Sequence, residues 1–237
     1  MDQWTFCEAL GPVEGNAVLR AHWATWYTEA DFQEMVAKDI ETVRLPIGDW
    51  TIRQYGPYVG CTDGAEEAID WFMDMAAKYD IKVLLDVHAV KGSQNGFDNS
   101  GLSNVTTWID ENHFEHWATA KGEWMGPFDL ESYSYEYINQ DNIDFALETI
   151  DQLLAKWGNH PALYALEPVN EPWWASDIDV LKQFYRDVRA KIQAVNNDVI
   201  FVFHDSFIFD HGLWNDLFTD YTNVVLDTHQ YLAWWGW

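Results

Sequence analysis

Five short apolar segments dominate the pattern of hydrophobic and polar positions along the chain. They are residues 42–47, 81–88, 163–169, 199–203 and 224–228. Most are rich in β-branched or aromatic residues, and neighbours such as Leu84 and Leu85 break any clean alternation with polar positions. Such continuous apolar runs are typical of parallel strands that are buried on both faces.

The stretches between these segments carry apolar residues at helical spacing. We expect helices at residues 29–38, 65–79, 143–157 and 178–195, and a short one near residues 212–218. Strands that alternate with helices predict an α/β fold with a parallel sheet and covering helices. Neither an internal repeat nor a linker composition divides the sequence, so we expect one domain over residues 1–237.

Polar and ionisable residues cluster at or just beyond the carboxyl end of each predicted strand. They are Arg44 and Asp49, His88, Asn170 and Glu171, His204 and Asp205, and His229 and Tyr231. This arrangement is the active-site rim of a (β/α)8 barrel. A doubly wound open sheet also binds ligands at this end, but no Gly-x-Gly-x-x-Gly turn follows a strand here, and we favour the barrel. The long stretch 89–137 lies on the same face, where insertions usually shape a pocket.

The composition limits the possible partners. The 237 residues include 39 acidic against 13 basic ones, giving a formal net charge of -26. Phosphate backbones and anionic membrane surfaces would be repelled, so we expect no nucleic-acid partner. The strong acidity suits a neutral polyol, which needs no electrostatic capture.

The cysteines and the chain ends say less. Cys7 and Cys61 are too few for a disulfide framework or a four-cysteine zinc site, although one bridge is possible. We find no apolar run of about 18 residues or more that would span a membrane. The first eight residues lack the basic and apolar regions of a secretory signal.

The tripeptide Asn170-Glu171-Pro172 ends the third apolar segment and carries the clearest chemistry. The Asn170 amide can bind a hydroxyl group, and the flat apolar faces of Trp173 and Trp174 can stack on pyranose rings. If these aromatic side chains exclude water, the pKa of Glu171 should rise, which suits a general acid. The alternative is an ordinary loop with a solvated glutamate.

Several motifs, taken in order, resemble glycoside hydrolase family 5, and in particular its fungal-type exo-β-1,3-glucanase branch. Residues 5–11 resemble the opening segment of that branch, and residues 43–50 (Val-Arg-Leu-Pro-Ile-Gly-Asp-Trp) resemble its Arg-Ile-Pro-Ile-Gly-Tyr-Trp strand. The most specific match is Leu-Asp-Val-His at 85–88 followed by Gly-Ser-Gln-Asn-Gly-Phe-Asp-Asn-Ser-Gly at 92–101. Asn170-Glu171-Pro172 and His229-x-Tyr231 follow in the expected order.

The resemblance implies a retaining glycosidase in which Glu171 is the acid/base and Asn170 binds the 2-hydroxyl of the sugar. It implies that Arg44 orients Asn170 and the nucleophile, and that His229 and Tyr231 lie near the nucleophile. The family carries this second glutamate on its seventh strand, and we count about strands 2 to 6 here, with strands 1, 7 and 8 missing. We therefore expect a partial barrel, an internal fragment of a glycoside hydrolase catalytic domain that is inactive alone.

The same resemblance implies the residues that bind substrate. His88 would line the subsite of the terminal sugar, and Asp98 beside Phe97 would bind its hydroxyls and block the cleft, which gives exo action. Trp234 stands where the branch usually has Phe in an aromatic clamp at the pocket mouth, and Trp174 also departs from the usual residue. Family resemblance further implies a monomer that needs no cofactor and acts outside the cell or at the cell wall.

Two other functions remain open. A carbohydrate-binding pseudoenzyme would use the same rim without cleavage, and an endo-β-1,4-glucanase would need an open cleft, which the loop at residues 95–101 argues against. His204-Asp205 and Asp227-x-His229 could hold a metal, but no His-Glu-x-x-His or similar spacing supports one, and we expect none.

Overall fold

The computed structural model describes residues 2–103, 105–109, 115–120, 122–129, 131–208, 210–218 and 222–231. Five parallel strands form its main sheet in the order β1-β2-β7-β8-β9. Their bounds are β1 Thr42–Gly48, β2 Lys82–Ala89, β7 Leu163–Glu167, β8 Ile200–His204 and β9 Val224–Asp227. These are the five predicted strands, shifted by at most two residues at either end.

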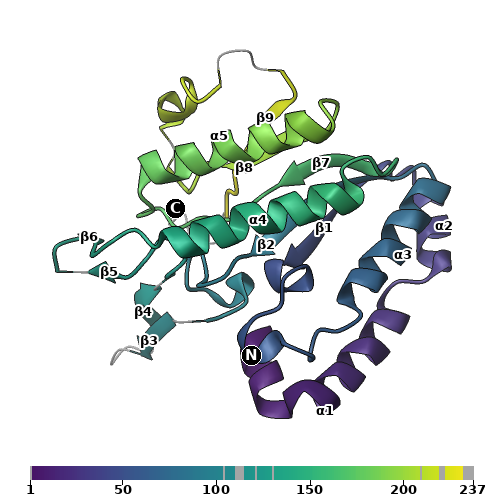
Figure 1. Cartoon of the computed structure of the whole chain (residues 1–237), viewed down its shortest axis with the longest axis horizontal. Coiled ribbons are helices and arrows are strands. Elements are labelled where there is room, and N and C mark those ends of the chain that lie inside the picture. The colour runs from purple at the N-terminus through teal and green to yellow at the C-terminus, as the bar shows by residue number, and fades with distance from the viewer. Residues whose placement is uncertain are drawn as a thin grey trace.

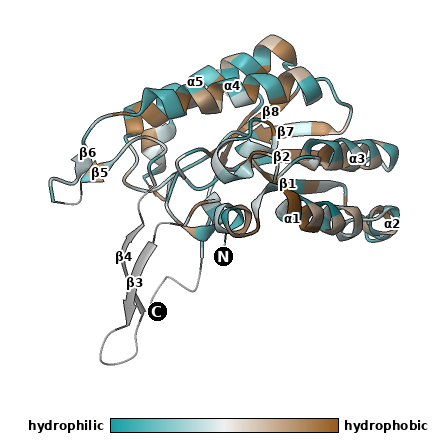
Figure 2. Cartoon of the chain, turned by 60° about the horizontal axis from the view of Figure 1, so that its bottom comes forward, coloured by the Kyte–Doolittle hydropathy of each residue, from teal (hydrophilic) through white to brown (hydrophobic). Residues whose placement is uncertain are grey.

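Helices α3 Ala65–Lys78, α4 Gln140–Trp157 and α5 Ile178–Val195 connect successive strands of the sheet (Figure 1). Helices α1 Gln3–Trp26 and α2 Glu29–Ala37 precede β1. In Figure 2, apolar and polar residues alternate along the neighbouring helices α4 and α5. The apolar residues pack on the sheet, and the buried apolar side chains of α5 are Leu181, Phe184, Tyr185, Val188 and Ile192. The short helix predicted near residues 212–218 is the single 3-10 turn His211–Trp214.

Side-chain contacts show that the sheet curls like part of a barrel. Arg44 of β1 reaches past β2 to bond with Glu167 of β7, and it also interacts electrostatically with Asp227 of β9, at the opposite edge of the sheet. Residues on the outermost strands could not interact in a flat sheet of five strands, because strands lie about 4.8 Å apart. The predicted partial barrel is therefore confirmed.

Two features were not predicted. Helix α1 kinks at Gly11, whose φ of 70° is left-handed, and Pro12 follows it. The stretch 89–137 contains two hairpins, one of β3 Val105–Ile109 with β4 Glu115–Ala120 and one of β5 Phe128–Asp129 with β6 Ser134–Tyr135.

A disulfide joins Cys7 of α1 to Cys61, in the segment between β1 and α3. The sequence left this pairing open. The bridge fixes α1 to the loop that follows β1. Within the described ranges, no helix combines the length and the apolar character needed to cross a membrane.

Candidate active site

The turn after β7 carries Asn170 and Glu171 and is held by side chains from the loop that follows β2. Gln94 donates from Nε2 to the backbone oxygen of Asn170 at 2.7 Å, and Asn95 donates from Nδ2 to that of Glu171 at 2.9 Å. The amide of Asn170 also donates to the carbonyl of Val87 in β2. Glu171 has a φ of 45°, which is uncommon for a residue with a side chain, and these contacts hold it there.

Three hydrogen-bond donors surround the Glu171 carboxylate. Its Oε1 accepts from the hydroxyl of Tyr231 at 2.5 Å and from Nδ1 of His229 at 2.6 Å. Its Oε2 accepts from Nδ2 of Asn99 at 2.8 Å. The structure therefore brings together three of the predicted catalytic residues, Glu171, His229 and Tyr231, from strands that are not neighbours in the sheet.

His229 is held between two carboxylates. Its Nε2 lies 3.1 Å from Oδ2 of Asp227 while its Nδ1 contacts Glu171. The hydrogen bonds to Asp227 and Glu171 raise the pKa of His229 to about 10. The ring is therefore an imidazolium near neutral pH, with both nitrogens donating.

The prediction that the pKa of Glu171 is raised is wrong for this arrangement. Burial raises that pKa, but the hydrogen bonds from His229 and Tyr231 and the positive charge of His229 outweigh burial and lower it to about 2. Exclusion of water by tryptophans, on which the prediction rested, does not decide this pKa. In the structure the donors lie on the carboxylate, while the Trp174 side chain is 51% exposed.

Arg44 organises a second group of side chains beside this one. Its Nη2 donates to Oδ1 of Asn170 at 2.8 Å and to Oε2 of Glu167 at 2.8 Å, and it lies 3.2 Å from Oδ2 of Asp86. The contact between Arg44 and Asn170 is the one that the resemblance implies. Asp86 and Glu167 are both fully buried, and the Arg44 guanidinium supplies the positive charge that these buried carboxyl groups need.

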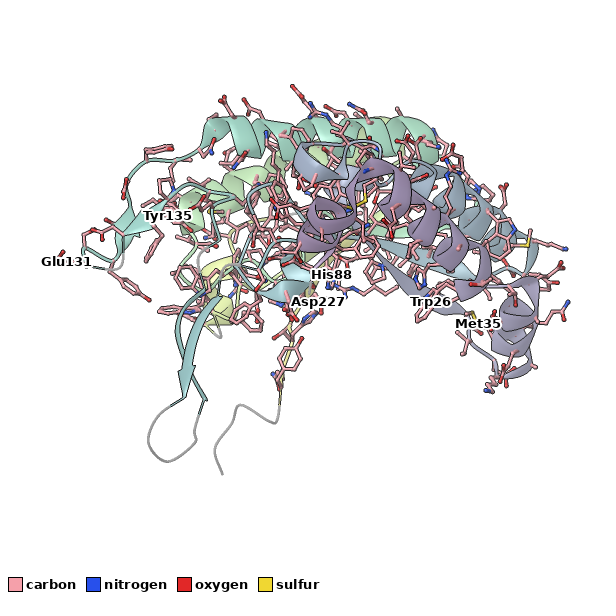
Figure 3. The ribbon with its side chains drawn as sticks, turned by 90° about the horizontal axis from the view of Figure 1, so that it is seen from below. Trp26, Met35, His88, Glu131, Tyr135 and Asp227 are labelled. Atoms are coloured by element: carbon pink, nitrogen blue, oxygen red, sulfur yellow. A yellow bond between two sulfur atoms is a disulfide. The ribbon has the colours of Figure 1, made fainter. Side chains whose placement is uncertain are left out.

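His88 connects to the same group through Asp86. Its Nδ1 lies 2.7 Å from the Asp86 oxygen that Arg44 also contacts. Figure 3 labels His88 and Asp227, which both project to the central part of that view, at the end of the sheet that carries Glu171. A chain of contacts thus runs from His88 through Asp86 and Arg44 to Asn170.

The predicted substrate-binding residues Phe97 and Asp98 lie in the loop that follows β2, where the backbone amide of Phe97 donates to Oδ1 of Asn95 at 2.9 Å. Phe97 is half-buried and Asp98 is exposed at the start of a 3-10 turn. Trp174 packs against Tyr133 and Trp173 rather than against the carboxylate. Trp234 lies outside the described residues.

Sequence reasoning gave no role to Asp86, Asn99 or Glu167. For the two acids the signal was present, because a charged residue inside an apolar strand needs a buried partner. Asp86 and His88 are two positions apart in β2 and therefore share one face of the strand, the face that carries the site. Asn99 lies in the Gly-rich motif, but nothing in its spacing indicates a bond to Glu171.

Glu171, His204 and His229 place possible metal-binding atoms within 4.8 Å of one another. The hydrogen bonds of both histidines already occupy ring nitrogens. Nδ1 of His204 accepts from the amide of Ser206 at 3.0 Å, so the proton of the neutral ring sits on the buried Nε2. In the same site, both nitrogens of His229 are already engaged by the carboxylates of Glu171 and Asp227.

Comparisons with known proteins agree with this geometry. No family model matches the chain. It is 31% identical over 98% of its length to a glucan 1,3-beta-glucosidase from Schwanniomyces occidentalis, and 32% identical over 98% to one from Blumeria graminis. The resemblance predicted from the motifs is confirmed. The chain spans about half the length of these curated relatives, 48% in each case.

Solved structures show the same fold. The rutinosidase from Aspergillus niger superposes with a TM-score of 0.73 at 22% identity, covering 97% of this chain and 61% of that one. The structure called AoRut gives a TM-score of 0.74 at 22% identity, with 97% and 60% covered. At this identity the likeness concerns the fold alone.

Proposed function

We propose that this chain provides the acid/base side of the active site of a retaining exo-β-1,3-glucosidase. The observation that carries the proposal is the pair Asn170 and Glu171, fixed at the carboxyl end of a barrel strand with Arg44, His88, His229 and Tyr231 around it. Similarity to glucan 1,3-beta-glucosidases over 98% of the chain supports the same activity.

An unpaired donor marks the place for the sugar. Among the residues that the structure describes, Nδ2 of Asn170 is buried and has no hydrogen-bond partner. Its Oδ1 is fixed by Arg44, which orients the amide. We propose that this Nδ2 donates to the 2-hydroxyl of the sugar at the cleaved bond, where a bond that strengthens in the transition state accelerates the reaction.

A retaining mechanism needs a second carboxylate about 5 to 5.5 Å from the first. Of the nearby described acids, Asp227 is separated from Glu171 by the His229 ring, and Glu167 is engaged by Arg44. We propose that the nucleophile comes from outside the described residues, and that it draws the donors His229 and Tyr231 toward itself. Without those two donors, burial would raise the pKa of Glu171 and make it a usable acid.

The exo mode rests on the loop after β2. Asn95 and Asn99 bond to Glu171 itself, so the loop closes against the acid rather than leaving an open cleft. We propose that it blocks the cleft beyond the terminal sugar, with Phe97, Asp98 and His88 lining that end and Trp234 at the mouth. Action outside the cytosol is supported by the Cys7–Cys61 bridge, because disulfides persist in oxidising compartments.

The test uses the complete enzyme with laminarin as substrate. Glucose should appear from the start, first as the β-anomer by NMR, and Glu171→Gln should lower the rate by at least about 10²- to 10⁴-fold, because both the acid and base steps are lost. Glu14→Gln, at an exposed position on α1, is the matched control and should be unchanged. Near-normal turnover of Glu171→Gln would remove Glu171 from the mechanism, and a ladder of oligosaccharides would exclude exo action.

The lowered pKa of Glu171 favours a second candidate, a carbohydrate-binding protein that does not cleave. A carboxylate that stays ionised accepts hydrogen bonds from sugar hydroxyls but cannot protonate a leaving group. Binding of laminarin without any release of glucose by the complete protein would establish this candidate.

A further inference from the structure

Five aromatic side chains form one continuous cluster beside the acid. Phe128, Tyr133 and Tyr135 come from the β5–β6 hairpin, and Trp173 and Trp174 come from the turn after β7. Ring centroids lie 5.1 Å apart for Phe128–Trp173, 5.3 Å for Phe128–Tyr133, 5.6 Å for Tyr133–Trp174 and 5.7 Å for Trp173–Trp174. We call this group the aromatic platform.

The platform has a buried base and an exposed upper layer. Phe128 and Trp173 are 6% and 8% exposed, whereas Tyr133 and Trp174 are each 51% exposed. The two exposed rings are adjacent and tilted by 39° to each other. Large aromatic rings kept in water side by side on a rigid base are typical of a binding surface rather than of a core.

The supporting backbone is fixed in advance. Asp129 accepts hydrogen bonds from the amides of Glu131 and Ser132, which shapes the hairpin turn. On the other side, Ser206 donates from Oγ to the carbonyls of Trp173 at 2.7 Å and of Pro172 at 2.9 Å. Binding of a ligand would therefore cost little free energy for ordering this backbone.

Charge and shape indicate the chemistry of the ligand. Residues 122–138 and 172–178 contain no Lys, Arg or His, but include Asp129, Glu131, Glu136 and Asp177. An anionic ligand would be repelled. A hollow of about 360 Å³ adjoins the platform, lined by Tyr133, Ser134, Tyr135, Tyr137 and Asp177, so hydroxyl and carboxylate groups adjoin the apolar faces. Apolar faces with hydrogen-bonding groups at their edge match a neutral pyranose.

We propose that the aromatic platform binds sugar rings of a neutral β-glucan chain, beyond the bond that Glu171 cleaves. Trp174 follows Glu171 by three residues, which places the platform next to the acid along the chain. Figure 3 shows Tyr135 and Glu131 of the hairpin to one side of His88 and Asp227. The part of the proposal that places the platform beyond the cleaved bond rests on the proposed function, but the binding of β-glucan by the platform does not.

The binding test uses the full chain carrying Glu171→Gln, with laminarin cast in native gels and laminarihexaose in fluorescence titrations. Replacing Trp174 or Tyr133 by Ala should weaken binding by about 2- to 10-fold each, as expected for one lost stacking ring. The double variant should show the larger loss. Trp26→Ala is the matched control, because Trp26 is 63% exposed on α1 at the other side of the molecule (Figure 3), and it should leave binding unchanged.

A further pair of variants guards against misfolding. Trp174→Phe with Tyr133→Phe keeps two stacking faces and should retain most of the affinity that the alanine pair loses. The proposal would be overturned if laminarin in the gel slowed the alanine double variant as much as the parent protein. An equal loss of affinity in Trp26→Ala would also overturn it. Loss of p-nitrophenyl β-glucoside binding, with laminarihexaose binding intact, would also overturn it.

Kinetics in the complete enzyme separate this proposal from the proposed function. The alanine double variant should raise KM for laminarihexaose at least about 5-fold and leave hydrolysis of p-nitrophenyl β-glucoside unchanged, because that substrate does not extend over the platform. An equal effect on both substrates overturns the platform while hydrolysis stands. If the complete protein binds laminarin through the platform but does not hydrolyse it, the platform is supported and the proposed function is overturned.

Discussion

Glu167 ends β7 and Glu171 lies in the turn that follows, and both are buried, yet their pKa values are shifted in opposite directions. Burial and the negative charge of Asp86 raise the pKa of Glu167 to about 7, against the attraction of Arg44. For Glu171, burial is outweighed by hydrogen bonds from His229 and Tyr231, and its pKa falls to about 2. Their side chains are 0% and 8% exposed. Burial alone therefore does not decide the protonation state; the partners do.

The two pKa values differ because the two glutamates have different numbers of hydrogen-bond donors and positive charges beside them. One guanidinium, that of Arg44, serves both Asp86 and Glu167, and in the part of the chain that the structure describes, Oε1 of Glu167 and Oδ1 of Asp86 have no partner. The Glu171 carboxylate instead has an imidazolium, a phenol and an amide. Two neighbouring acids with pKa values pushed apart are typical of sites that move protons.

Removing the shared cation should have the largest effect. Arg44→Met leaves Asp86 and Glu167 buried without a positive charge, and the usual cost is about 3 to 5 kcal/mol of unfolding free energy. We expect the lower end of that range, because the Arg44 side chain is 30% exposed. Urea unfolding at pH 8 and pH 5 measures it, and the loss should be smaller at pH 5, where Glu167 holds a proton.

The control for this prediction is Arg186→Met. Arg186 is exposed on α5, so its replacement should change stability by at most about 0.5 kcal/mol. An equal loss at both pH values in Arg44→Met would mean that the charge of Glu167 plays no part in the effect.

Opposite pH slopes should distinguish the two glutamates. The folded state holds Glu171 at a pKa below its ordinary 4.5, so its contribution is complete above pH 4.5 and is lost as the pH falls toward 2. Glu167 has a raised pKa, so the folded state keeps a proton that the unfolded chain releases, and stability falls as the pH rises from 4.5 through about 7. Unfolding free energies between pH 2.5 and 8 measure both slopes.

Isosteric amides isolate each slope. Glu171→Gln should remove a stabilisation on the order of 2 to 3 kcal/mol at neutral pH and flatten the acidic side of the profile. Glu167→Gln should flatten the decline between pH 4.5 and 7 and leave the acidic side unchanged. The same slope change in both variants would contradict pKa shifts of opposite sign in the two glutamates.

Much of this arrangement could be predicted from the sequence. The exceptions depend on contacts between segments that lie far apart along the chain. The five strands follow from continuous apolar runs such as residues 163–167, and the strand ends place Arg44, Asn170 and Glu171 at one mouth. Helix α1 was not predicted because a glycine and a proline interrupt its pattern. Its only described buried residues are Cys7 and Gly15, so it lacks the apolar spacing of a helix that packs on a core. It lies against the loop after β1, fixed by the disulfide, and shows little apolar stripe.

The site shows the same limit. Which residues meet could be read from strand order, but the pKa of Glu171 depends on which oxygen receives which donor. His229 follows Glu171 by 58 positions, and its contact with Asp227 gives the ring its charge. The order of the motifs predicts that these residues lie near Glu171, but it does not predict which of its oxygens each of them contacts.

A single hydroxyl provides the finest test of the comparison. Tyr231→Phe removes the donor that lies 2.5 Å from Oε1 and leaves His229 and Asn99 in place. We expect the pKa of Glu171 to rise by about one unit, the low end for a hydrogen bond to a charged group, because Tyr231 is 46% exposed. Carbon-13 NMR titration of the Glu171 carboxyl measures the shift. Tyr137→Phe, at a more exposed tyrosine, is the control, and an unchanged pKa in Tyr231→Phe would assign the lowering to His229 alone.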